Sequence, residues 1–144
     1  MNNKVMRVEF TIPGPPRSWK RRNTGRSRST GKSVSFNDPK YEQHKKHVAW
    51  LMIQHTTESE RQLIRGSRLS LQLAMYFPSF RVQDADRVLN LVLDAGKSLF
   101  WVDDTWTTFE GGEIVLRPAL DRKNPRVEVV VDCIAPLTRE MEAE

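Results

Sequence analysis

Apolar and polar side chains alternate along residues 5–12, 69–77 and 127–133. In the clearest of these stretches, 69–77, large apolar residues occupy every odd position (Leu69, Leu71, Leu73, Met75, Phe77). A period of two places every second side chain on the same face of a β-sheet. We therefore predict three strands, each with one face in the hydrophobic core.

A helical pattern separates the first two strands. Asp38 precedes Pro39, and an aspartate cap followed by proline at the first helical position is a typical helix start. The spacing predicts a helix from there to about residue 55 with a buried stripe (Tyr41, Val48, Leu51, Met52, His55). His44 and His47 are three residues apart, but no third metal ligand is near them in the sequence, so we interpret them as surface residues. Residues 56–66 are polar and predict a connection.

A second helix is predicted after the strand at 69–77. Its apolar residues recur at helical spacing without an intervening proline (Val88, Leu89, Leu91, Val92, Leu93, Ala95). Asp86, Asn90 and Lys97 fall on one stripe of this helix, with Asp94 beside it. Gly96 is a natural residue to follow a helix C-terminus.

The remaining segments complete a single α+β domain over 1–144, with a mixed β-sheet packed against two main helices. We predict a short strand at 33–36 and a strand at 105–116 with a bulge at Gly111-Gly112. Residues 118–125 are predicted to turn the chain back into the last strand, and the charged tail, 137–144, to fray.

The composition is that of an ordinary globular protein, with 38% apolar and 28% charged residues in 144. No apolar run approaches the ~18 residues of a membrane span, and the N-terminus has no signal-peptide core. The single cysteine, Cys133, cannot form an internal disulfide and is expected to be buried. We therefore expect a cytoplasmic protein without a membrane partner.

The net charge of +5 is concentrated in one segment. Residues 17–32 hold seven bases and no acid (Arg17, Lys20, Arg21, Arg22, Arg26, Arg28, Lys32). We predict that residues 13–33 form a basic mobile loop, because they are poor in apolar side chains. Such a loop suits contact with a polyanion, with Trp19 available to stack on a base. The alternative without a binding role is a solvated hairpin arm with Trp19 packed against the core.

Acidic residues flank the second helix. Asp84 and Asp86 precede or begin it, and Asp103 and Asp104 follow it. Acids at a helix N-terminus can have a purely structural role, because they cap free N–H groups. Converging carboxylates would instead repel one another, which a divalent cation relieves. Oxygen ligands without cysteine or histidine favour Mg²⁺ or Mn²⁺, and such a site beside a basic loop suits phosphodiester hydrolysis.

These residues resemble a known pattern. Asp84-Ala85-Asp86, a helix, and Trp101-Val102-Asp103-Asp104 are similar to the Asp-x-Asp … Asp-Asp pattern of RusA-type Holliday junction resolvases, small endonucleases of bacteria and their phages and prophages. The segment Pro15-Pro16-Arg17-Ser18 also resembles that family.

The resemblance implies that Asp84, Asp86 and Asp104 are metal-binding catalytic acids, with Asp103 as their neighbour. It also implies a Mg²⁺-dependent homodimer (Mn²⁺ as substitute) that nicks two strands of a four-way DNA junction. Arg87 stands where the family usually has asparagine, and Asn90 where a catalytic lysine is common. A non-catalytic junction binder of the same fold and an RNA-binding module are therefore alternative functions.

The end of the second helix determines how such a site closes. If the helix reached Phe100, Asp104 could barely return to Asp86 of its own chain, and Asp104 of the partner subunit would be the easier second ligand for a cation at Asp86. A helix that ends near Gly96 is only about 15 Å long from Asp86. The eight residues from there to Asp104 span up to about 28 Å, so the glycine favours closure within one chain.

Overall fold

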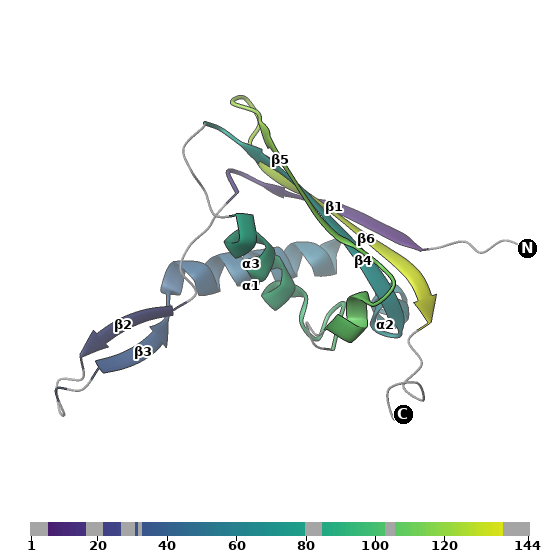
Figure 1. Cartoon of the computed structure of the whole chain (residues 1–144), viewed down its shortest axis with the longest axis horizontal. Coiled ribbons are helices and arrows are strands. Elements are labelled where there is room, and N and C mark those ends of the chain that lie inside the picture. The colour runs from purple at the N-terminus through teal and green to yellow at the C-terminus, as the bar shows by residue number, and fades with distance from the viewer. Residues whose placement is uncertain are drawn as a thin grey trace, which may run out of the picture.

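The computed structural model describes residues 6–16, 22–26, 31, 33–79, 85–102 and 106–136. Within them it contains six strands, three α-helices and one 3₁₀ helix (Figure 1). In chain order these are β1 (Arg7–Pro13), β2 (Arg22–Arg26), β3 (Ser33–Asn37), α1 (Pro39–Gln54), α2 (Glu58–Arg65), β4 (Ser67–Phe77), α3 (Ala85–Gly96), η1 (Trp106–Phe109), β5 (Ile114–Leu120) and β6 (Arg126–Pro136).

The main sheet has four strands in the order β1-β6-β4-β5. The pairs β1–β6 and β6–β4 are antiparallel, whereas β4 and β5 run parallel, so the sheet is mixed as predicted. Helices α1 and α3 lie on the same side of this sheet (Figure 1). The predicted single α+β domain is therefore confirmed.

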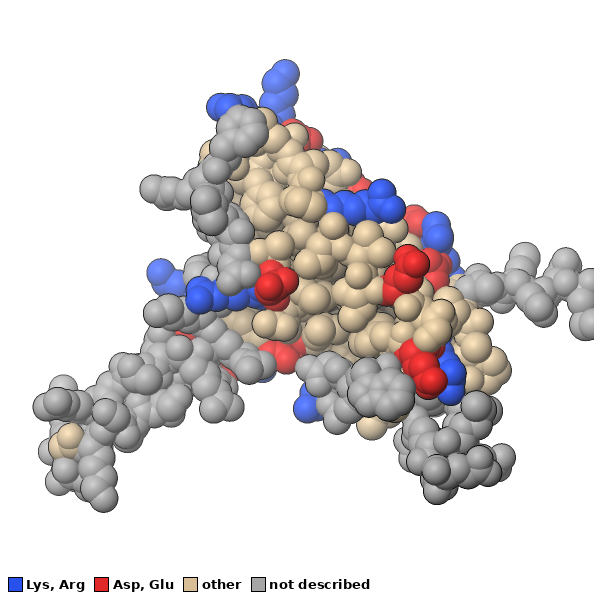
Figure 2. Space-filling model, in the orientation of Figure 1, with Lys and Arg blue, Asp and Glu red and all other residues tan. Residues whose placement is uncertain are grey.

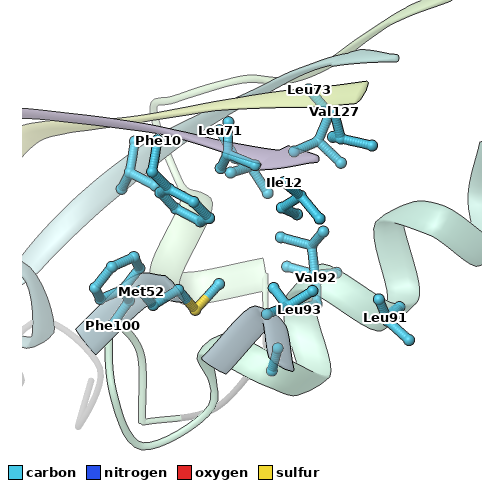
Figure 3. Packing of buried hydrophobic residues seen from close by; sticks show 14 of the residues in the cluster. Phe10, Ile12, Met52, Leu71, Leu73, Leu91, Val92, Leu93, Phe100 and Val127 are labelled. Carbon is cyan, nitrogen blue, oxygen red and sulfur yellow. The ribbon is translucent and has the colours of Figure 1, made fainter. Parts of the chain in front are cut away.

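The core forms between the sheet and these helices. Every second residue is buried along β1, along β4 as far as Met75 and along β6 as far as Cys133, which confirms the three alternating strands. Figure 3 shows side chains of the sheet, among them Phe10 and Leu71, facing Met52 of α1 and Val92 of α3. Cys133 is buried, as predicted, and this burial raises the pKa of its thiol.

Helix α1 begins and ends close to where the sequence predicts. The Asp38 side chain accepts a hydrogen bond from the Lys40 N–H at 2.8 Å, and Pro39 is the first helical residue. Four of the five residues of the predicted buried stripe are buried, but His55 is exposed. It lies at the C-cap, where its Nδ1 is 2.8 Å from the Leu51 carbonyl oxygen.

The prediction of a polar connection over 56–66 is wrong, because α2 lies there; among the described residues it is a short third helix beside the two main helices that were predicted. Thr57 and Glu60 form a capping box: each side chain accepts a hydrogen bond from the other residue's backbone N–H. This motif satisfies the exposed amides of a helix start. Ile64 is the buried residue of α2.

The strand predicted over 105–116 is confirmed only at its end. Residues 106–109 form η1, and β5 begins only at Ile114. Gly111 has a φ of 77° in the intervening turn, so the glycines belong to a turn rather than a bulge. Pro118, predicted to begin the turn over 118–125, lies inside β5; this is possible because β5 is at the edge of the sheet.

Strands β2 and β3 form a separate antiparallel hairpin, which projects away from the main sheet (Figure 1). β3 confirms the short strand predicted at 33–36. β2 lies within the segment 13–33, for which the sequence predicted a loop. The mobility of that loop stays a prediction, and the tail at 137–144 lies outside the described residues.

Candidate functional site

Helix α3 carries the one predicted metal ligand that the structure describes. Asp86 is in its first turn and is exposed. The opposite side of the helix is buried against the sheet and α1 (Val88, Leu91, Val92, Leu93, Ala95). Asn90 and Lys97 are exposed like Asp86, as their predicted common stripe requires. The apolar face therefore fixes the orientation in which the Asp86 side chain is exposed.

A contact with α1 holds the middle of α3. The buried Tyr41 hydroxyl of α1 donates a hydrogen bond to a carboxylate oxygen of the half-buried Asp94. These residues are 53 positions apart, and the sequence pattern placed Asp94 only beside the polar stripe. The contact fixes α3, and with it Asp86, relative to α1.

The C-terminal end of α3 is determined by Gly96 and Trp101. The helix ends at Gly96, as the glycine predicted, and the Trp101 indole covers that glycine. A Cβ atom on residue 96 would lie 2.3 Å from the Trp101 ring. The Trp101 Nε1 donates to the Leu93 carbonyl oxygen at 2.8 Å, and its backbone N–H donates to the Gly96 carbonyl oxygen at 3.4 Å. The chain thus turns back immediately after the helix.

This turn shortens the reach of the segment that holds Asp103 and Asp104. Because Trp101 is still beside Gly96, only three residues lead from it to Asp104, and they span about 10 Å. Asp86 is about 15 Å from Gly96 along the helix axis. Closure within one chain therefore requires 102–104 to run back along α3 nearly extended. The reach is much smaller than the sequence implied.

Several predicted site residues lie outside the described residues: Asp84, Asp103, Asp104, Arg17, Lys20, Arg21, Arg28 and Lys32. Arg22 and Arg26 lie in β2, where the backbone alone is described. In the part of the chain that the structure describes, no three carboxylate, imidazole or thiol groups converge as a metal site would need. Asp86 itself fits such a site, because an exposed carboxylate offers the oxygen donors that hard divalent cations prefer.

The charge outside the basic segment is balanced. Of the 23 lysines and arginines, seven lie within 17–32, and the rest of the chain contains the remaining 16 together with all 18 aspartates and glutamates. Figure 2 shows bases and acids interspersed over the described part of one face. Several acids are paired with arginines, such as Asp132 with Arg7 at 2.7 Å.

Comparison with known families identifies the chain's relatives. The model of the family Endodeoxyribonuclease RusA matches residues 13–132, which is most of the chain and includes both acidic pairs and the basic segment. The chain belongs to the RusA endodeoxyribonuclease family.

The RusA match assigns the chain its activity: it is a metal-dependent endodeoxyribonuclease that resolves Holliday junctions, so its substrate is junction DNA. A search of curated proteins finds no match. No helix among the described residues is long and apolar enough to cross a membrane.

Proposed function

We propose that this RusA-family chain acts as a Mg²⁺-dependent homodimer that introduces paired nicks into a four-way junction. In this proposal Asp84, Asp86 and Asp104 are the metal-binding catalytic acids, and Asp103 is their neighbour. The observation that carries it is the exposed carboxylate of Asp86 in the first turn of a helix whose opposite face is buried and fixed. Mn²⁺ would substitute, because it accepts the same oxygen donors.

The residues of the chain perform three tasks in this proposal. The three aspartates would hold the cation, which would supply activation of a water molecule and charge stabilisation of the leaving oxygen of the phosphodiester. The Tyr41–Asp94 contact and the Trp101–Gly96 turn hold α3 and the following segment in position. The bases of 17–32 hold the DNA backbone by charge. Each task depends on a different part of the chain, so each can be removed separately.

The decisive experiment uses a labelled four-way junction and a linear duplex of matched sequence, each with and without Mg²⁺. The wild-type protein should nick the junction only with Mg²⁺, and Asp86→Asn should abolish nicking while junction affinity is retained. The control Glu113→Gln changes another exposed carboxylate, just before β5, and should nick normally. Nicking by Asp86→Asn, or by the wild type in EDTA, would overturn the site assignment.

The same assay separates the alternative functions. A non-catalytic junction binder of the same fold would bind the junction with or without Mg²⁺ and never nick it. An RNA-binding module would bind RNA, linear duplex and junction equally.

Mixed dimers test how the site closes. We propose closure within one chain, with 102–104 extended toward Asp86, because two aspartate side chains and an ion can cover the remaining few ångströms. Dimers of one Asp86→Asn subunit and one Asp104→Asn subunit then have two defective sites and do not nick. If Asp104 of the partner subunit supplied the ligand, one site would be intact and one strand would be cut.

A further inference from the structure

The outward face of α1 carries a row of aromatic rings that the core does not use. The His44 and His47 ring centroids are 6.3 Å apart, and the His47 and Trp50 rings stack at 6.2 Å with an interplanar angle of 17°. Residues three apart are neighbours on a helix surface, so the rings follow one ridge of α1. Trp50 is 54% exposed, which is unusual for so large an apolar side chain.

The charge beside this row is positive. Helix α1 holds three lysines, Lys40, Lys45 and Lys46, and a single acid, Glu42. Glu42 forms an ion pair with Lys45 at 3.0 Å, so its charge is already matched. Lys46 is exposed and is four residues before Trp50, on the same side of the helix.

The position of α1 relates this face to the basic segment. The helix starts two residues after β3, so its N-terminal end adjoins the hairpin β2–β3 (Figure 1). Trp50 is eleven residues from Pro39, about 16 Å along the helix axis. At about 3.4 Å per base pair, this corresponds to roughly five base pairs of duplex. One DNA molecule can therefore contact the hairpin and Trp50 together.

We infer that Lys46, His47 and Trp50 form a second DNA-contact surface, on which Trp50 stacks against a base exposed at the branch point of the junction. The inference rests on the proposed function and adds a residue that senses DNA structure. Bases at a branch point lose part of their stacking, and an exposed aromatic ring beside cations is the arrangement that binds unstacked bases. A subunit interface fits less well, because lysine is depleted in interface cores.

The test measures affinity for the four-way junction and for the matched linear duplex in EDTA, where no strand is cut. Trp50→Ala should weaken junction binding about 10-fold and change duplex binding less than about two-fold. Trp50→Phe should retain most of the junction affinity, because the ring still stacks. The control Leu63→Ala removes another exposed apolar side chain, 55% exposed on α2, and should bind like the wild type.

Fluorescence gives a second readout. Junction DNA should quench tryptophan emission of the wild type, and this part of the quenching should be lost in Trp50→Phe. The inference would be overturned if Trp50→Ala bound the junction as tightly as the wild type. It would also be overturned if Trp50→Ala converted a dimer to a monomer, because this face of α1 would then be a subunit contact. If the wild type itself shows no preference for the junction, the proposed function fails instead.

Discussion

Gly96→Ala should destabilise the protein, although alanine is the better helix former. The new Cβ would lie 2.3, 2.7 and 2.8 Å from three atoms of the Trp101 ring. These distances are too short for any real contact, and the ring cannot simply move aside because Trp101 is only 1% exposed. It also contacts the rings of Phe100 and Phe109, with centroids 5.9 and 6.0 Å away.

The magnitude follows from three terms. Overfilling a packed core costs about 1–3 kcal/mol. Displacing the indole also breaks the hydrogen bond from Nε1 to the Leu93 carbonyl oxygen, at a net cost of about 1 kcal/mol. The helix propensity of alanine returns up to about 1 kcal/mol. The net loss is about 2 kcal/mol, which for a chain of this size lowers Tm by roughly 4–8 °C.

Thermal unfolding of Gly96→Ala beside Gly66→Ala measures this effect. Gly66 caps α2, and the nearest atom to its added Cβ is 3.7 Å away, so that variant should melt within about 2 °C of the wild type. In a Trp101→Ala background the clash is gone, and Gly96→Ala should no longer destabilise. A Gly96→Ala protein that melts like the wild type would refute the reasoning.

Two further predictions concern charge. If the basic segment contacts phosphates, affinity falls as salt rises, and replacing Arg22 and Arg26 with alanine should make the slope of log affinity against log salt shallower by about 0.9 per lost contact. Arg117→Ala on β5 should leave this slope unchanged. Hydrogen bonds from the Asn124 backbone N–H and the Arg126 guanidinium lower the pKa of Asp121. The ionised carboxylate therefore stabilises the fold above its usual pKa of 3.8, and this contribution disappears as the pH falls through the lowered pKa. Asp121→Asn should lower Tm at pH 7, and its difference from the wild type should shrink in acid; a constant difference would contradict this.

The sequence predicts elements well where the pattern is local. Strand β4 follows from strict alternation, and α1 follows from Asp38 and Pro39 at its start. Helix α2 is absent from the prediction because few apolar residues mark its eight positions, although the Thr57–Glu60 capping box was a readable signal. β5 was misplaced because Pro118 ends a central strand but is tolerated at a sheet edge.

In the candidate site too, features set by local sequence were predictable, and features set by tertiary packing were not. Asp86 lies in the first turn of α3, as the acid pattern predicted, and it is exposed together with Asn90 and Lys97 of the same stripe. The turn after Gly96 was not predictable, because it depends on Trp101 packing against Phe109 as well as on the glycine. The bond between Tyr41 and Asp94 likewise joins two helices through tertiary packing, which no local spacing reveals.

The position of β6 has a consequence for biosynthesis. β6 pairs with both β1 and β4, and paired residues of β1 and β6, such as Arg7 and Asp132, are 125 positions apart. At about 5–20 residues per second, a ribosome needs roughly 6–25 s to make that stretch. During this time β1 has no strand to pair with and β4 lacks its antiparallel neighbour. The sheet therefore completes only after β6 has left the ribosome. Until then the nascent chain exposes unpaired strand edges, which are the surfaces on which aggregation begins.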